Sequence, residues 1–247
     1  MHDLLPHAGL ATSNRMGAHT PILTEQGLTI DGYLCLAHCK VTDLTRKEPS
    51  TSFKKLSAQL AVPPPPQQAA QQQIDFFPAM QASPVNAPKA ILQPLLEWRR
   101  GSWTISTWLV RGAPGNLDIA TGTTAIQVSP GTSLTAVIEL KRRVVGHTSY
   151  WSYWAGFAGY DAVSLYVDLP YELTEIGFAL EAYRVSSRDC KAELPSPPVV
   201  FTSIQIEGSD GSPLFPDWNL VQGPSACGFR VTEETRIAKG DTIIFSG

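Results

Sequence analysis

Short apolar segments separated by turn residues dominate the sequence from residue 74 onward. Examples are "AILQPLLEW" (90–98), "TSLTAVIEL" (132–140) and "FALEAYRV" (178–185), with turn-forming stretches such as "GAPGN" (112–116) between segments of this kind. Apolar segments of this length, punctuated by Gly, Pro, Asn, Asp and Ser, are typical of antiparallel strands. We therefore expect an all-β protein, an antiparallel β-sandwich of two sheets, with a closed β-barrel as the alternative.

The pattern also indicates how the chain is divided. Residues 1–30 are polar, with scattered Gly and Pro and no sustained period, so we expect an irregular N-terminal arm. The strand pattern then continues without a linker, which indicates a single β-sandwich domain over 31–247. Helices should be few and short, and the one plausible helix is "DLPYELTEI" (168–176).

Two strand candidates precede residue 74. The first is "GYLCLA" (32–37) and the second is "FKKLSAQLAV" (53–62), in which every second residue is apolar. Leu56, Ala58 and Leu60 should therefore share one face of that strand. Four prolines follow at 63–66, and they cannot continue a sheet ladder, so we expect an exposed connection over 63–73.

Composition excludes several classes of function. The chain has 247 residues, with 19 basic and 22 acidic side chains and a net charge of −3. It lacks the basic excess of nucleic-acid-binding proteins, and no apolar stretch approaches the roughly 20 residues that span a bilayer. We expect neither a nucleic-acid partner nor a membrane. The start also lacks the charged and apolar segments of a secretory signal, which predicts a cytoplasmic protein.

The four cysteines predict reduced thiols. On an extended strand Cys35 and Cys39 would lie about 13 Å apart, which is too far for a disulfide. Reduced cysteines are the usual state inside cells, and we extend that expectation to Cys190 and Cys227. A metal site at Cys35, His38 and Cys39 is the alternative, but no second ligand pair follows at a useful spacing. We expect no metal and no cofactor.

Candidate chemistry is confined to carboxyl and amide groups on strands. The sequence has no Gly-rich phosphate loop, no G-x-S-x-G and no H-E-x-x-H. Gln93 and Glu97 interrupt one apolar strand and share a face of it, and Glu181 and Tyr183 share a face of another.

A carboxylate on an apolar strand has two interpretations. Glu181 can be a structural group, solvated or paired with Arg184 or Lys191. It can also be a partly desolvated acid whose raised pKa suits it to proton transfer. For Gln93 the same choice lies between a structural hydrogen bond and a catalytic one.

The order of several segments resembles the glutamic peptidases, or eqolisins, a family with a concanavalin-like β-sandwich. "AILQPLLEW" resembles the family's Ile-Leu-Gln-x-Gly strand, and "FALEAYRV" resembles its Ala-Glu-Trp-Ile-Val strand. Further segments with similar counterparts in the same order are "DGYLCL", "LSAQLAVPPPP", "SWTISTWLV", "VSPGTSLTAVIEL" and "VVFTSIQIEG". The resemblance covers residues 31–208.

The resemblance implies a hydrolase with a catalytic pair, Gln93 and Glu181, and without a cofactor. The glutamate would act as general acid or base, and the glutamine amide would donate to an oxyanion, an interaction worth roughly 2.7–4 kcal/mol. This chain departs from the family at two positions: Thr107 stands where the family has a glutamate, and Pro94 replaces the glycine after the catalytic glutamine. We expect Gln93 and Glu181 to approach each other across one concave sheet.

Aromatic residues predict where a ligand would bind. We expect an aromatic-lined cleft for a peptide or a small molecule, with core packing as the alternative for part of the set and Trp98 in the core. The candidate ligand contacts are Glu97, Trp103, Trp108, Trp151, Tyr153 and Tyr183. Two other functions stay open: an intracellular cyclase, isomerase or lyase of an apolar small molecule, and a carbohydrate-binding module without catalysis.

Overall fold

The structure of the protein is a computed structural model. It describes residues 22–23, 29–40, 52–69, 71–82, 89–113, 116–186, 190–196, 198–222, 227–234 and 241–246. Most of the N-terminal arm expected over 1–30 lies outside these residues.

Within the described residues, nine strands form the first sheet, and all of its pairs are antiparallel. The order is β1 (Ile22–Leu23), β2 (Thr29–Lys40), β12 (Glu175–Ser186), β4 (Gln73–Ala82), β5 (Lys89–Arg99), β6 (Ser102–Ala113) and β7 (Asn116–Gly122). Two further strands pair outside this path: β14 (Asn219–Gln222) with β2, and β8 (Ile126–Val128) with β6.

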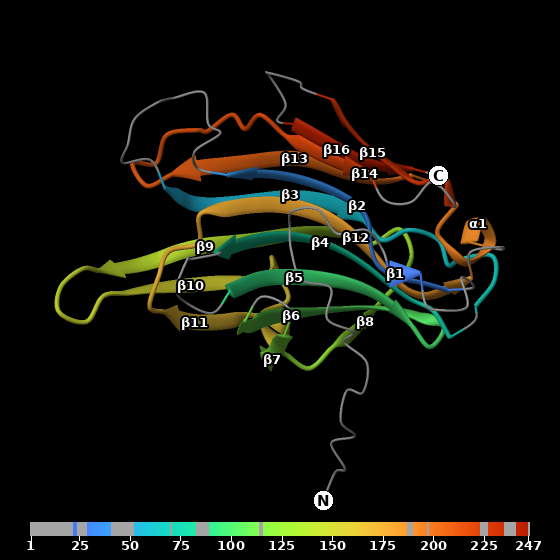
Figure 1. The fold of residues 1–247 in the computed structure, drawn as a ribbon, viewed down its shortest axis with the longest axis horizontal. Coiled ribbons are helices and arrows are strands. Elements are labelled where there is room, and N and C mark those ends of the chain that lie inside the picture. Colours follow the sequence, from blue (N-terminus) through green and yellow to red (C-terminus); the bar gives the residue numbers. More distant parts are fainter. Residues whose placement is uncertain are drawn as a thin grey trace, which may run out of the picture.

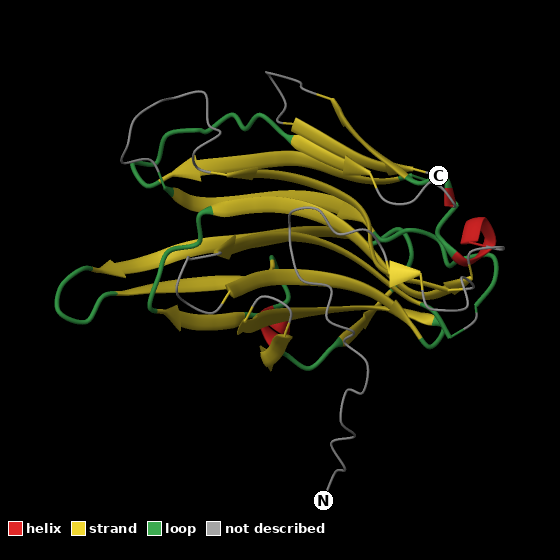
Figure 2. Cartoon of the chain, viewed as in Figure 1, coloured by secondary structure: helices red, strands yellow, loops and turns green. Residues whose placement is uncertain are grey.

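A second antiparallel sheet of seven described strands packs against the first. Its order is β11 (Leu165–Leu169), β10 (Tyr150–Phe157), β9 (Ser133–Val144), β3 (Phe53–Ala61), β13 (Val199–Gly208), β16 (Asp241–Ser246) and β15 (Arg230–Glu234). Figure 1 shows the long, curved strands of both sheets. Helical elements in the described chain include a 3₁₀ turn, η2 (Asp161–Val163), and one helical turn, α1 (Cys190–Glu193), and all are short (Figure 2). The two-sheet sandwich is confirmed, and the barrel alternative is wrong.

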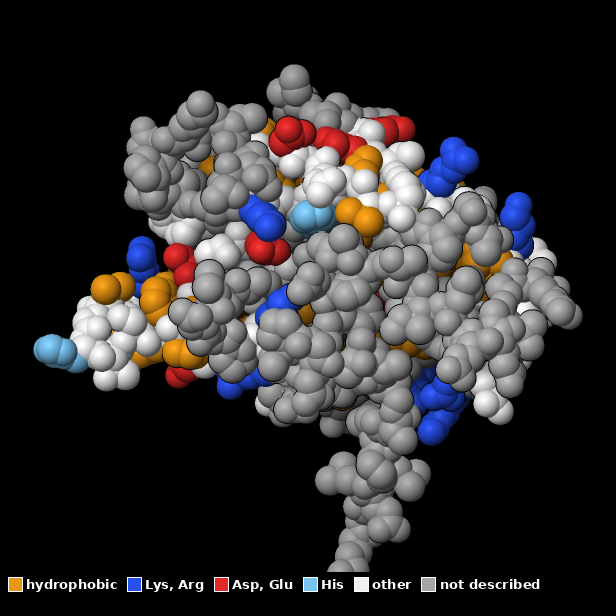
Figure 3. All heavy atoms as spheres, viewed as in Figure 1, with side chains coloured by type: hydrophobic (Ala, Val, Ile, Leu, Met, Phe, Trp, Pro, Cys, Tyr) orange, Lys and Arg blue, Asp and Glu red, His pale blue; other side chains and the backbone are white. Residues whose placement is uncertain are grey.

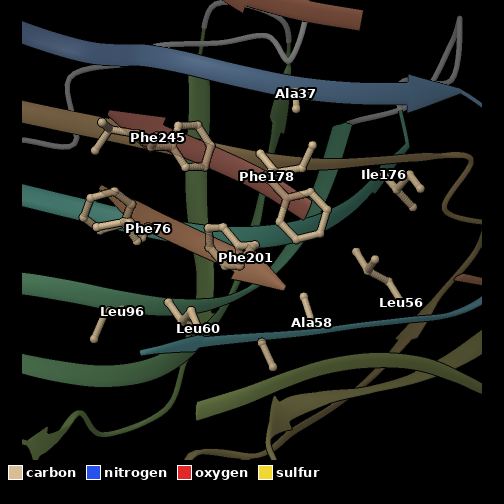
Figure 4. Close-up of a cluster of buried hydrophobic side chains, with 14 of the residues drawn as sticks. Ala37, Leu56, Ala58, Leu60, Phe76, Leu96, Ile176, Phe178, Phe201 and Phe245 are labelled. Atoms are coloured by element: carbon tan, nitrogen blue, oxygen red, sulfur yellow. The ribbon is translucent and has the colours of Figure 1, made fainter. Parts of the chain in front are cut away.

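The main core lies between the two sheets. Figure 4 shows Phe76 and Phe178 of the first sheet facing Phe201 and Phe245 of the second. The ring centroids of Phe178 and Phe201 are 4.9 Å apart, and those of Phe76 and Phe245 are 6.2 Å apart. Large buried aromatic side chains therefore hold the sheets together.

Alternation along the strands decides which side chains enter this core. In β3 the buried residues Leu56, Ala58 and Leu60 belong to the core, as their spacing predicts. In β12 Phe178 and Leu180 belong to it, whereas Ala179 between them points to the opposite face of the first sheet. We call that opposite face the outer face.

The helix expected over 168–176 is wrong. Residues up to Leu169 form β11, which pairs with β10, and Glu175 begins β12. Ser152 of β10 donates a hydrogen bond to the carboxylate of Asp168, 2.5 Å away. Pairing with a neighbouring strand therefore outweighs the weak helical propensity of this short segment, and Pro170, which has no N–H, follows where the strand ends.

The expectation of four reduced cysteines is also wrong. Cys190 and Cys227 form a disulfide that ties the start of α1 to the segment before β15, with a Cα–Cα distance of 5.5 Å. Cys35 and Cys39 keep their thiols, and both belong to the core. Since His38 alternates with Cys39 and lies on the outer face, the three side chains do not converge on a metal ion.

Replacing Phe178 by Ala should destabilise the protein strongly. The ring is fully buried and contacts Phe201 and Trp218, so its removal leaves a cavity between the sheets. We expect a loss of about 3–5 kcal/mol in the free energy of unfolding, measured by urea titration. Tyr166→Ala is the control, because that side chain is 72% exposed and its loss should cost less than about 0.5 kcal/mol. Equal losses in the two variants would contradict this account of the core.

Candidate active site

The candidate site lies on the outer face of the first sheet, at its central strand β12. Glu181 pairs in register with Tyr33 of β2 on one side and with Asp75 of β4 on the other. Asp75 in turn pairs with Glu97 of β5. Because residues directly opposite each other in antiparallel strands project to the same face, three carboxyl groups lie side by side. We call Glu181, Asp75 and Glu97 the carboxyl row.

Glu181 is held by two tyrosine hydroxyl groups. Tyr183 donates a hydrogen bond of 2.8 Å to Oε2 of Glu181, and Tyr33 donates a second hydrogen bond to the same carboxyl group. Glu181 is only 8% exposed. Burial raises the pKa of Glu181 to about 7, although the two hydrogen bonds act in the opposite direction. This carboxyl group therefore changes its charge near neutral pH.

Asp75 and Glu97 complete the row in similar surroundings. Asp75 is 3% exposed, and Gln73 donates a hydrogen bond of 2.8 Å to its Oδ2. Burial raises the pKa of Asp75 well above its usual value, and the charges of Glu97 and Glu181 add to this effect. Glu97 is half-buried; burial raises its pKa too, and the charge of Arg99 opposes the shift. The sequence analysis did not predict Asp75 as a site residue. Like Gln93, however, Asp75 is a polar residue inside an apolar segment, "IDFFPAM".

Gln93 lies on the outer face but not beside Glu181. Its neighbour Leu92 pairs with Met80 of β4, which pairs with Ile176 of β12, so the β12 residue level with Gln93 is Gly177. Four residues along β12 and two strand spacings separate Gln93 from Glu181, about 13 Å along the strands and about 10 Å across them.

A row of apolar side chains lies between the positions of Gln93 and Glu181. Ala179, Phe77 and Leu95 occupy neighbouring strands there and belong to a hydrophobic cluster that is separate from the main core. The ladder between β4 and β5 is interrupted at the same place, where each strand carries a proline, Pro78 and Pro94. Proline has no N–H to donate, which explains the interruption.

A different glutamine does contact a glutamate on this face. Gln81 of β4 pairs with Glu175 of β12, and its Nε2 donates a hydrogen bond of 2.5 Å to Oε2 of Glu175. Lys40 of β2 lies 3.8 Å from the other carboxylate oxygen of Glu175. Both Gln81 and Glu175 are buried. The sequence did not predict this pair, because Glu175 lies inside the segment expected to be a helix and Gln81 follows the end of "IDFFPAM" (74–80).

The predicted aromatic contacts divide between two locations. Tyr183 belongs to the site, and Trp108 pairs with Gln93 and packs on the outer-face cluster. Trp103 and Tyr153 are 1% and 0% exposed and belong to the core between the sheets, so they are not part of this face. Trp151 lies in β10 of the second sheet and packs against the same core. Where a strand carries large apolar residues on both faces, alternation alone does not tell which face is the core, and this explains the misplacement. Trp98 is in the core, as predicted.

Two negative findings apply to the described part of the chain. It contains no cluster of three or more His, Cys, Asp or Glu side chains arranged to hold a metal ion. Nor does it contain a helix with the length and apolar character needed to cross a bilayer.

Glu181 should make stability depend on pH. The pKa of Glu181 is about 7 in the folded protein, whereas its ordinary value is 4.5. The folded state therefore loses this proton at a higher pH than the unfolded state does, and the folded state becomes less stable as the pH rises from about 4.5 through 7. At about 1.36 kcal/mol per pH unit between the two values, the penalty is about 3 kcal/mol. The free energy of unfolding of Glu181→Gln minus that of wild type should therefore increase by about this amount between pH 4 and pH 8, as measured by urea titration.

The control for this measurement is Glu139→Gln, which removes a carboxyl group on β9 of the second sheet. A difference between Glu181→Gln and wild type that is the same at both pH values would contradict the raised pKa of Glu181.

No family model and no curated protein matches this sequence, but solved structures match its fold. Two crystal structures of scytalido-glutamic peptidase, one with a transition-state analogue inhibitor and one with a peptide-based transition-state analogue, have TM-scores of 0.52 and 0.51. In both, 15% of residues are identical, and the match covers 88% of this chain and 98% of that chain. A structure of SCP-B, an eqolisin in complex with the tripeptide Ala-Ile-His, has a TM-score of 0.49 at 13% identity, with the same coverage. The resemblance to the eqolisins is thus confirmed at the level of the fold, the β-sandwich of the glutamic peptidases.

Proposed function

We propose that this protein is a cofactor-independent hydrolase that cleaves amide bonds in peptides, with Glu181 as its general acid and base. The observation that carries the proposal is a buried carboxyl group with a pKa of about 7, held by two tyrosine hydroxyl groups on a fold shared with glutamic peptidases. Such a group has both protonation states accessible near neutral pH, which is the condition for efficient acid–base catalysis.

Tyr33 and Tyr183 orient the carboxyl group in this proposal. Each donates a hydrogen bond to Glu181, and each is 7% exposed. A carboxylate has about four acceptor positions, so two such hydrogen bonds leave acceptor positions for a water molecule or a substrate. They also stabilise the ionised form, so loss of either hydroxyl would raise the pKa of Glu181 further.

Gln93 takes the role of a substrate-binding group rather than that of an oxyanion donor at the scissile bond. The separations of about 13 Å along the strands and about 10 Å across them combine to about 16 Å, which an extended peptide of about five residues spans. The amide of Gln93 would then hydrogen-bond the substrate backbone beside the indole of Trp108. The cluster that includes Phe77, Leu95 and Ala179 would favour apolar side chains on the substrate between these points.

The observations disfavour the other functions. A carbohydrate-binding module would use an aromatic face, but three of the five candidate aromatic contacts, Trp103, Trp151 and Tyr153, pack in or against the core between the sheets. The surface seen in Figure 3 intersperses basic with acidic side chains, unlike a nucleic-acid interface. A cyclase, isomerase or lyase would use the same carboxyl group, but the peptide-binding structures that share the fold favour hydrolysis.

The disulfide bears on the proposed location of the protein. Cys190 and Cys227 pair in the structure. Disulfides persist in oxidising compartments and are rare in the cytosol. We therefore favour an oxidising compartment over the cytoplasmic location that the start of the sequence predicts.

Hydrolysis of an unfolded protein substrate tests the proposal. Wild-type protein should cleave reduced, denatured casein, with a rate that changes around pH 7 across a series from pH 3 to 9. Glu181→Gln should lower the rate at least 100-fold, since general acid–base catalysis contributes about 10²–10⁴-fold. Glu139→Gln, on the second sheet, is the matched control and should keep the wild-type rate. Absence of cleavage by wild-type protein over the whole series would refute the peptidase proposal.

A further inference from the structure

The carboxyl row contains a second acid that the proposed mechanism does not yet use. Asp75 lies directly opposite Glu181 on adjacent antiparallel strands, so their Cβ atoms are about 5 Å apart. Asp75 is more deeply buried than Glu181, with 3% of its surface exposed against 8%. Two carboxyl groups at this separation, both shielded from water, cannot both be ionised at low cost.

One oxygen of Asp75 lacks a partner within the described part of the chain. Its Oδ2 accepts the hydrogen bond from Gln73, while its buried Oδ1 has no hydrogen-bond partner there. An unpartnered buried oxygen is costly, unless it carries a proton or meets a ligand. This oxygen therefore marks a place where a proton, a water molecule or a substrate atom is expected.

The groups around Asp75 favour a proton on it. Glu181 from β12 and Glu97 from β5 add negative charge, Arg99 from β5 opposes them, and Gln73 donates to it. Tyr33 from β2 and Tyr183 from β12 hydrogen-bond Glu181 and leave it the easier of the two acids to ionise. Burial and the two neighbouring carboxyl charges raise the pKa of Asp75 well above its usual value.

We infer that Asp75 is a second catalytic residue, which shares one proton with Glu181 so that the two carboxyl groups act as an acid–base pair. Asp75 carries the proton, and Glu181 is the ionised member. This inference rests on the proposed function, because it describes the same site and the same reaction.

The pair accounts for every proton in amide hydrolysis. The Glu181 carboxylate takes a proton from water as the water oxygen bonds to the acyl carbon, and Asp75 gives its proton to the carbonyl oxygen. In the second step the C–N bond breaks, Glu181 passes its proton to the leaving nitrogen, and Asp75 recovers a proton from a hydroxyl group of the intermediate. The products are a carboxylic acid and an amine, and both side chains return to their starting states.

Titration of the two carboxyl groups without substrate tests the inference. Side-chain carboxyl carbons of the full-length, ¹³C-labelled protein would be followed by NMR from pH 3 to 10 in wild type, Glu181→Gln and Glu97→Gln. In wild type, Asp75 should stay protonated while Glu181 ionises. Burial and the charge of Glu97 hold the proton on Asp75, and the charge of Glu181 adds to them, so Glu181→Gln should lower the titration midpoint of Asp75 by at least one pH unit. Ionisation of Asp75 below pH 5 in wild type, or an unchanged midpoint in Glu181→Gln, would overturn the pair.

Activity then tests the catalytic role of Asp75. Asp75→Asn keeps the shape of the side chain and an oxygen for the Gln73 hydrogen bond, but it cannot give up a proton. It should lower casein hydrolysis at least 100-fold, with an unchanged circular-dichroism spectrum, whereas the control Glu139→Gln on the second sheet should keep the wild-type rate. Near-wild-type hydrolysis by Asp75→Asn would refute the catalytic role. The titration needs no substrate, so a confirmed pair in a protein without hydrolysis would refute the proposed function and the catalytic role of Asp75, but not the proton shared by the two carboxyl groups.

Discussion

The register of β2, β12, β4 and β5 is the constraint on which the candidate site depends. Side chains alternate between the two faces of a strand, so a slip of one residue in β12 would turn Glu181 into the core and Phe178 out of it. The contacts of Phe178 with Phe201 and Trp218 oppose that slip. The packing between the sheets therefore fixes the positions of the carboxyl groups on the outer face.

This arrangement costs stability where the candidate chemistry is concentrated. Burial of Glu181 and Asp75 penalises their ionised forms, and the adjacent negative charges increase the cost for Asp75. A sheet face selected only for stability would replace such groups with apolar ones, as the neighbouring cluster around Phe77 and Leu95 does. Buried groups that lower stability are expected at functional sites, and the carboxyl groups of the carboxyl row are groups of this kind.

Local pattern predicted the strands, but it could not predict what lies beside them. Alternation identified the core face of β3 and the shared face of Gln93 and Glu97, because both follow from geometry within one strand. Asp75 becomes significant only when β4 is paired with β12, a relation between residues more than 100 positions apart. The same limit explains the disulfide between Cys190 and Cys227, which joins segments brought together by the fold.

Two glutamine–glutamate pairs on the outer face are candidates for a functional contact, and the strand register shows which of them lie side by side. The resemblance to the eqolisins selects Gln93 and Glu181 by the motifs around each residue, yet Gly177 is the β12 residue level with Gln93. The amide and carboxyl groups in contact are Gln81 and Glu175, and Lys40 lies next to Glu175. Among the described residues no Lys or Arg forms an ion pair with Glu181, and its partners are two tyrosines and a second buried acid. We therefore assign the proposed proton transfer to the carboxyl row, and the Gln81–Glu175 contact holds β4 and β12 together.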